Sequence, residues 1–309
     1  MKKYLPEGCL INTPENKKYI STAKGLYEAM TLGLILEARV ESCDKDRNLI
    51  IDLPCMKGLI PKIEGAIGIE SGQTRDIALI SRVNKPVCFK VISINTDENG
   101  IETAILSRRA VQEECRKIFI EKLNSGDIIP AKVTHLENFG CFVDIGCGIP
   151  SLIPIDAVSV SRISHPSDRF VIGQNIRVII KDVDKNRVWL SHKELLGTWE
   201  ENAKQFKKDE TVSGIVRSVE SYGIFIELAP NLAGLAEIGK AAEVGQQASV
   251  HIKAIIPEKM KIKLVIVDVF SAEYTPSPLK YFINDEHISY WNYTPENSAK
   301  KIESYFPPL

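Results

Sequence analysis

The chain has 309 residues, 44% of them hydrophobic and 26% charged, which is an ordinary globular composition with room for two or three domains. Its formal net charge of -1 excludes a strongly basic coat, although it allows a local basic groove. Seven cysteines without a CxxC pair, and no histidines at zinc spacing, argue against a metal site and for reduced thiols.

Residues 1–32 are predicted to form a helical extension. The sequence TPEN at 13–16 offers threonine as an N-cap and proline as the first helical residue. The first residues lack the apolar run of a secretory signal, and no stretch approaches the roughly 18 apolar residues of a membrane span. We therefore expect a soluble cytoplasmic protein without membrane contact.

Residues 33–108 are predicted to form a first small barrel. The stretch 35–61, ILEARVESCDKDRNLIIDLPCMKGLIP, has the pattern of two strands and a Gly-Leu segment. The stretch 85–107, KPVCFKVISINTDENGIETAILS, supplies a late strand pair. A helical linker is expected at 109–124, because this part of the chain has helical apolar spacing and few β-branched residues.

Residues 125–192 carry the clearest strand pattern. The stretch 129–145, IPAKVTHLENFGCFVDI, alternates apolar and polar positions on both sides of a break at 138–140. The stretch 172–191, IGQNIRVIIKDVDKNRVWLS, adds a Gly-Gln turn, a long strand, a charged turn and another strand. A second helical linker is expected at 193–207.

Residues 208–267 repeat this layout. VSGIVRSVESYGIFIEL (212–228) follows the first strand pair of the middle unit, and VGQQASVHIKAIIPEKMKIKLV (244–265) follows its second. The three units also share a turn segment, which is KGLIP at 57–61, PSLIP at 150–154 and AGLAE at 233–237. Five short strands with a gap after the third indicate a small Greek-key barrel.

The predicted fold is therefore mainly β, with three tandem five-stranded barrels of the oligonucleotide-binding type joined by helical linkers. Residues 268–309 form an aromatic-rich extension, expected to be folded and α+β, because such a composition can bury apolar area. Within it, 280–291 (KYFINDEHISYW) has the pattern of a hairpin, and a second TPEN at 294–297 predicts a helix start.

The middle unit resembles the S-one RNA-binding domain at NFGCFVDI, SRISHP, the Gly-Gln turn and DKNRVWLS. This domain is the repeat of bacterial ribosomal protein S-one and occurs in polynucleotide phosphorylase and many translation factors. The resemblance is closest over 125–200, then over 208–267 and 33–108. It implies that one barrel face binds single-stranded RNA through two aromatics, a histidine, and a late aspartate and arginine.

In the middle unit, the resemblance places the aromatics at Phe139 and Phe142 and the late pair at Asp184 and Arg187. Pro154 occupies the position of the histidine. One RNA contact of the family is therefore absent from the best-matched unit.

The third unit matches in part, and the first unit hardly matches. Tyr222 and Phe225 keep the aromatics of the third unit, whereas Glu237, Pro257 and Lys261 replace the histidine, aspartate and arginine. In the first unit the replaced positions are Arg47, Ile50 and Pro61. The resemblance therefore implies a graded series in which the middle unit binds RNA best.

Other residues extend the candidate RNA surface. Trp189 lies two residues after Arg187, so strand alternation directs both to one side. His165, in a long loop, and Lys263, beside Lys261, are candidate contacts to RNA. Further candidates for phosphate contacts are Lys132, Arg162, Arg177, Lys181 and Lys193. Each has a structural alternative: core packing for the aromatics, and a solvated surface or loop position for His165 and the lysines.

The leading functional hypothesis is a translation-linked protein that binds single-stranded RNA, such as mRNA near the small ribosomal subunit. The alternative is a scaffold whose barrels dock a ribosome or nuclease, and a ribonuclease subunit is a third reading. The chain has no phosphate loop, HExxH, GxSxG or carboxylate cluster at metal spacing, so we expect neither an enzyme nor a cofactor.

Overall fold

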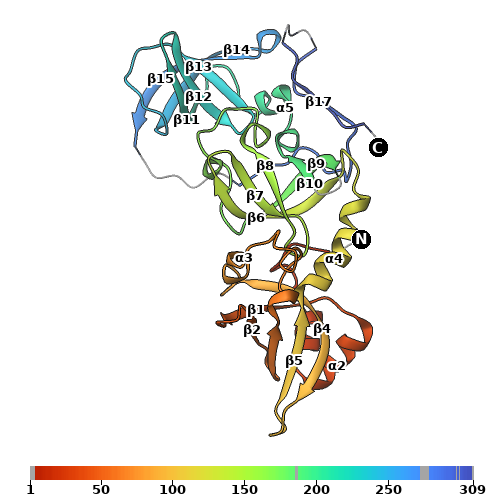
Figure 1. Ribbon diagram of the computed structural model, residues 1–309. Helices are drawn as coiled ribbons and strands as arrows, with labels where there is room; N and C mark the ends of the chain where they lie inside the picture. The colour runs from red at the N-terminus through yellow and green to blue at the C-terminus, as the bar shows by residue number, and fades with distance from the viewer. Residues whose placement is uncertain (1–3, 185–186, 272–277, 297, 299, 308–309) are drawn as a thin grey trace. The chain divides into compact units, whose positions relative to one another are not determined.

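The chain forms three closed five-stranded barrels in a computed structural model that describes residues 4–184, 187–271, 278–296, 298 and 300–307 (Figure 1). It divides into two compact units. The first consists of residues 1–123, 130–132 and 144–150, and the second contains the remaining residues. The predicted fold class, mainly β with three barrels, is confirmed.

The first barrel consists of β1 (Leu36–Cys43), β2 (Leu49–Asp52), β3 (Lys57–Ile60), β4 (Pro86–Thr96) and β5 (Glu102–Ser107). The strand order is β1-β2-β3-β5-β4, and β3 runs parallel to β5. Because strand side chains alternate between faces, every second one fills the interior. The fully buried interior residues include Val40, Leu49, Ile51, Ile60, Phe89 and Leu106.

Short helices complete the first unit. The predicted helix start at TPEN is confirmed by α1 (Pro14–Ile20), where Thr13 Oγ1 accepts from the backbone N–H of Asn16 at 3.2 Å. After it comes α2 (Ala23–Leu32), and η1 (Lys62–Glu64) and α3 (Ile77–Ile80) lie between β3 and β4. The first linker is helical as predicted, with α4 (Arg108–Ile118) and the 3-10 turn η2 (Ile120–Lys122).

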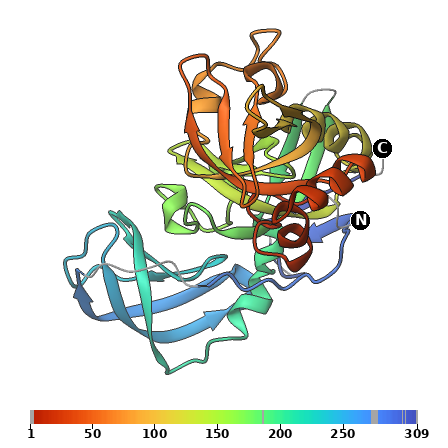
Figure 2. The ribbon, with the colours of Figure 1, turned by 90° about the horizontal axis from the view of Figure 1, so that it is seen from below.

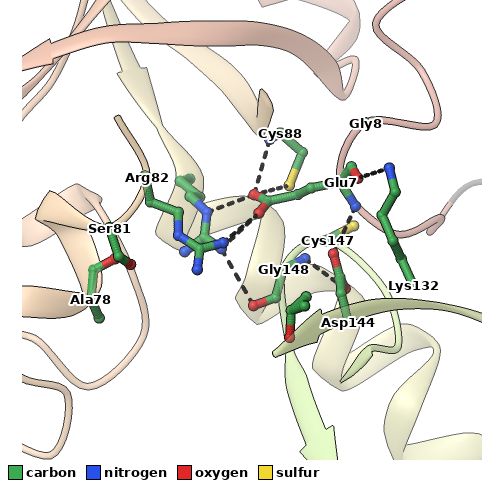
Figure 3. A network of polar contacts seen from close by, with 12 residues as sticks. Glu7, Gly8, Ala78, Ser81, Arg82, Cys88, Lys132, Asp144, Cys147 and Gly148 are labelled. Atoms are coloured by element: carbon green, nitrogen blue, oxygen red, sulfur yellow. Dashed lines mark hydrogen bonds and ion pairs between the residues drawn. The ribbon is translucent and has the colours of Figure 1, made fainter. Parts of the chain in front are cut away.

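A buried ion pair anchors the N-terminal segment in the first unit (Figure 3). The Glu7 carboxylate accepts from Arg108 Nε at 2.6 Å and Nη2 at 3.0 Å, and from the backbone N–H of Cys88 at 3.1 Å. Burial alone would raise the pKa of Glu7. The Arg108 guanidinium has the opposite effect, and the pKa of Glu7 lies below its ordinary value. The carboxylate is therefore ionised and paired, as a buried charge must be.

Asp144 belongs to the same network. Its carboxylate accepts from the backbone N–H groups of Glu7 at 2.7 Å, Gly146 at 2.8 Å and Gly148 at 3.0 Å. Burial and the charge of Glu7 raise the pKa of Asp144 to about 7. Lys132 Nζ donates to the carbonyl oxygen of Glu7 at 2.9 Å. Asp144 is thus buried, and the half-buried Lys132 makes a hydrogen bond within the first unit.

The middle barrel consists of β6 (Ile128–Glu137), β7 (Gly140–Asp144), β8 (Pro150–Pro154), β9 (Asn175–Asp184) and β10 (Arg187–Ser191). Its strand order is β10-β8-β7-β6-β9. Around the closed ring, this is the same order of equivalent strands as in the first barrel, and β8 runs parallel to β10. The interior residues include Val133, Cys141, Val143, Ile153, Val178 and Ile180. The long connection from β8 to β9 carries the 3-10 turns η3 (Ile155–Ala157) and η4 (Pro166–Asp168).

The third barrel has the same order in β11 (Thr211–Glu220), β12 (Gly223–Ala229), β13 (Leu232–Ala236), β15 (Lys261–Phe270) and β14 (Gln247–Ile256). The 3-10 turn η6 (Pro257–Lys259) lies between β14 and β15. Figure 2 shows this barrel in teal to blue. The second linker contains only η5 (Lys193–Leu196) and α5 (Trp199–Ala203). Buried charges join the middle and third barrels within the second unit. Arg169 pairs with Glu227, and Arg217 pairs with Glu227 and Asp168 at 2.9 Å each.

The C-terminal extension is folded, as predicted, but the hairpin expected at 280–291 is wrong. β16 (Tyr290–Asn292) instead pairs with β17 (Glu303–Tyr305). The backbone before β16 pairs with the start of the middle barrel, where Ile288 N–H donates to Gly126 at 3.0 Å and Ile128 N–H donates to Glu286 at 2.8 Å. The segment before β16 therefore forms backbone hydrogen bonds with residues 126–128 and does not form a hairpin with itself.

The helix start expected at 294–297 is also wrong. No helix begins in residues 294–296, and Asn297 lies outside the described residues. Thr294 Oγ1 accepts from the backbone N–H of Ile302 at 2.7 Å, across the turn that joins β16 to β17. The hydroxyl of Thr294, which could cap a helix, thus accepts a hydrogen bond from a residue close to β17.

Candidate nucleic-acid interface

Two phenylalanine rings form an exposed pair on the middle barrel. Phe139 lies in the turn before β7, and its side chain is 57% exposed. Phe142 lies on β7 between the buried residues Cys141 and Val143, so its ring faces outward and is half-buried. The two ring centroids are 6.0 Å apart and the planes are perpendicular. The predicted aromatic pair is therefore brought together on the outer face.

The glycine between the two rings has a steric reason. A Cβ atom at Gly140 would lie 2.4 Å from the carbonyl oxygen of Ile153 and 3.0 Å from Leu152 Cδ1, both on β8. Only glycine allows β7 and β8 to approach so closely. The third barrel repeats the arrangement, because a Cβ at Gly223 would lie 2.8 Å from the carbonyl oxygen of Ala236.

The late residues of the site lie on β9 and β10. Trp189 is 42% exposed and is in register with Leu152 on β8 and with Asp182 on β9. Arg187 on β10 and Asp184 on β9 are exposed and in register with each other. Since β8 lies between β10 and β7, one outer face carries the indole, Leu152 and Phe142 in succession.

The third barrel presents a matching face. Tyr222 is 67% exposed, and its ring lies 6.1 Å from that of Phe225 at a nearly perpendicular angle. Phe225 is in register with Leu235, and Leu235 with Lys263. Lys263 therefore occupies the position of Trp189, and Lys261 and Lys263 point to solvent because Ile262 and Leu264 point to the core. This barrel has one aromatic pair and two cations.

The first barrel has an aliphatic row in the same place. Ile50 is in register with Leu59, and Leu59 with Ile105, and all three are half-buried. Arg47 lies in the turn where the other barrels have Phe139 and Tyr222. The absence of rings predicted for this barrel follows directly from its sequence.

The other predicted contacts divide into two groups. Arg162 and Lys181 are exposed and Lys193 is half-buried. Arg177, in contrast, donates to the carbonyl oxygens of Ile283 at 2.5 Å and Asp285 at 2.6 Å. His165 Nδ1 accepts from the backbone N–H of Ser167 at 3.1 Å and caps η4. Arg177 is thus engaged by the C-terminal extension, and the described contacts of His165 serve its own loop.

His135 on β6 also lies beside the ring pair, although the sequence alone did not indicate it as a contact to RNA. Its imidazole lies 6.4 Å from the Phe142 ring with an angle of 32° between the planes. Its Nε2 is 2.7 Å from Glu137 Oε1. Strand alternation in the stretch 129–137 could have placed this residue on the outer face, but no family position points to it.

Neither a metal centre nor a membrane segment is found in the part of the chain that the structure describes. No group of three or more histidine, cysteine, aspartate or glutamate side chains there could hold a metal ion. No helix within those residues is long and apolar enough to cross a membrane.

The chain has relatives among known proteins. The sequence model of the S1 RNA binding domain, the S-one domain of the sequence analysis, matches residues 122–193, which contain the middle barrel. The small ribosomal subunit protein bS1 of Staphylococcus aureus strain COL is 30% identical over 296 residues, covering 88% of this chain and 73% of the relative. The bS1 protein of Staphylococcus haemolyticus is 32% identical over 272 residues, covering 81% of this chain and 66% of the relative.

A solved multidomain protein with nucleic acid binding domains from Streptococcus pneumoniae covers 76% of this chain at 14% identity, with 74% of its own chain covered and a TM-score of 0.25. That likeness is too low to add to the assignment. The assignment follows from the bS1 relatives and from the three barrels: the chain belongs to the bS1 family of S1-domain RNA-binding proteins.

Proposed function

We propose that this protein binds single-stranded RNA by stacking unpaired bases on two exposed ring pairs, Phe139 with Phe142 and Tyr222 with Phe225. One observation carries the proposal: the pairs occupy equivalent places on two barrels and have nearly the same geometry. Exposed groups of apolar rings mark interaction sites on protein surfaces. RNA-binding proteins use such rings as stacking platforms for bases.

The middle barrel contributes most to this binding. Trp189 supplies a further plane on the face that carries Phe142, and Arg187 contacts phosphate. Asp184, opposite Arg187, either orients the guanidinium or accepts a hydrogen bond from a ribose hydroxyl. On the third barrel Lys261 and Lys263 take the phosphate role. His165 is given no direct part in stacking.

The wider role rests on the relatives. Because these are named as proteins of the small ribosomal subunit, we propose that the chain holds unstructured mRNA near that subunit in the cytoplasm. It acts without catalysis and without a cofactor in this proposal.

A second function, docking of a ribosome or nuclease, is favoured by the first barrel alone. Its row of Ile50, Leu59 and Ile105 replaces the stacking face with aliphatic side chains, which suit a protein surface better than bases. In that case RNA binding would be secondary to protein contact.

Competition between single-stranded and duplex RNA tests the main proposal. Flat rings need unstacked bases, which an A-form duplex withholds, so the single strand is expected to displace a labelled oligouridine at a lower concentration. Replacement of Phe139 by alanine should reduce this preference, whereas Ile50→Ala, at the matching face of the first barrel, should leave it unchanged. Equal competition by both RNAs would contradict stacking. If Ile50→Ala reduced RNA affinity as much as Phe139→Ala, the assignment of faces would be wrong.

A further inference from the structure

His135 extends the ring cluster of the middle barrel beyond the two family positions. Its imidazole and the Phe142 ring lie 6.4 Å apart at a shallow angle of 32°, whereas Phe139 is perpendicular to Phe142. The three rings follow one another from the turn before β7 to the outer face of β6. A strand of RNA that stacks on Phe142 would therefore meet a second ring beside it, tilted by 32° from the first.

This ring distinguishes the middle barrel from the other two. In the third barrel Ser218 is in register with Phe225, and in the first barrel Ser42 is in register with Ile50. His135 precedes Phe142 by seven residues, and Ser218 precedes Phe225 by the same number. A serine hydroxyl offers no face for a base, so only the middle barrel has a third ring at this place.

His135 makes few contacts that would stabilise the fold. Its side chain is 61% exposed, and the described contacts that hold it are the Phe142 ring and the carboxylate of Glu137. An exposed pair of this kind contributes little to stability. The pair does fix the orientation of the ring, because Nε2 is held at 2.7 Å from Glu137 Oε1.

We propose that His135 is a third base-stacking residue of the middle barrel, oriented by Glu137. The carboxylate beside the ring repels phosphate, so the imidazole receives a base and not the RNA backbone. This inference rests on the proposed function and deepens it, because it names a contact that substitutes for the family histidine replaced by Pro154.

Binding of a labelled oligouridine to the full chain tests the inference with three variants. His135→Gln keeps a donor for Glu137 but removes the ring, and is expected to weaken binding roughly three- to tenfold. His135→Phe keeps a ring and should remain within about twofold of the original affinity. His287→Gln is the matched control, because His287 is also exposed and lies 2.8 Å from a carboxylate, that of Asp127, outside the ring cluster. It should bind as the unchanged protein does.

A second measurement separates stacking from an indirect structural effect. In the unchanged protein, the ring-proton resonances of His135 should move upfield as oligouridine is added, because a base placed over the ring shields them. Five histidines allow the resonance to be assigned by comparison with His135→Gln. A merely structural role would leave these resonances in place.

Three results would overturn the inference. If His135→Gln binds normally while Phe142→Ala weakens binding, His135 is not a contact and the proposed function stands. If His135→Phe is as weak as His135→Gln, the imidazole acts by hydrogen bonding and not by stacking. If neither His135→Gln nor Phe142→Ala affects binding, the proposed function itself fails.

Discussion

His192, which follows β10, is fully buried between two aromatic rings in the second unit. The rings of Phe170 and Tyr281 lie 4.9 and 5.7 Å from its own, and its Nδ1 donates to the carbonyl oxygen of Val158 at 2.9 Å. Burial, reinforced by the charge of Arg169, lowers the pKa of His192 to about 4. The folded protein therefore keeps this imidazole neutral in mildly acidic solution.

Acid should destabilise the second unit through His192. Between the ordinary pKa of 6.5 and the folded value of about 4, the unfolded chain takes up a proton that the folded chain does not. Stability is thus complete above pH 6.5 and falls as the pH is lowered, by about 1.4 kcal/mol per unit and about 3 kcal/mol in total by pH 4.

Urea unfolding measures this effect cleanly. The three tryptophans, Trp189, Trp199 and Trp291, all lie in the second unit, so their fluorescence reports its unfolding. His192→Gln should be less stable at pH 7 but should lose less between pH 6.5 and pH 4.5 than the unchanged protein. Parallel losses in both proteins would show that His192 does not cause the acid effect.

Several residues could not be placed from sequence because their partners are distant in the chain. Lys132 donates to a carbonyl 125 residues away and Arg177 to one 106 residues away, and a local sequence pattern does not reveal such contacts. Asp144, an acidic residue of the middle barrel, is buried beside Glu7. The ring pairs, in contrast, depend on strand alternation and a turn, which are local features of the sequence, and their role in RNA binding stays a prediction.

Among the elements, β7 and β8 approach each other closely at Gly140, beside the ring pair. Because a Cβ at Gly140 would meet the backbone of Ile153 at 2.4 Å, Gly140→Ala must push the two strands apart. Overpacking of this kind costs roughly 1 to 3 kcal/mol. Gly239→Ala is the matched control, since nothing lies within 4 Å of its Cβ position, and it should be neutral or slightly stabilising. Both are measured by urea unfolding; equal stabilities would refute the close approach.

The two TPEN sequences show where element prediction ends. Both offer the same threonine cap, but only Thr13 caps a helix, whereas Thr294 accepts from Ile302 across a strand connection. Pairing of β16 with β17 overrides the local signal there. The expected hairpin at 280–291 fails for the same reason, because its backbone pairs with residues 126–128.

At the scale of the whole molecule, one barrel topology carries three different outer faces. The row in register runs Ile50, Leu59 and Ile105 in the first barrel and Phe225, Leu235 and Lys263 in the third. The middle barrel has Trp189 and Leu152 in register, with Phe142 on the next strand. The barrels thus differ in their side chains and not in their topology, and we expect their RNA affinity to follow the graded series predicted from the sequence.

The proposed RNA affinity rests on ring stacking as well as on charge, and its salt dependence separates the two contributions. Each phosphate contact on a single strand contributes about -0.7 to the slope of log affinity against log salt. With a net charge of -1, the chain can sustain only about two to four such contacts, a slope of roughly -1.5 to -3.

Two variants divide that slope between its sources. Arg187→Ala should make it shallower by about 0.7, which is one contact. Phe142→Ala should lower affinity by roughly 1 to 3 kcal/mol, about 5- to 150-fold, and leave the slope unchanged. A slope steeper than about -5, together with normal binding by Phe142→Ala, would show that phosphate contacts and not the rings hold the RNA.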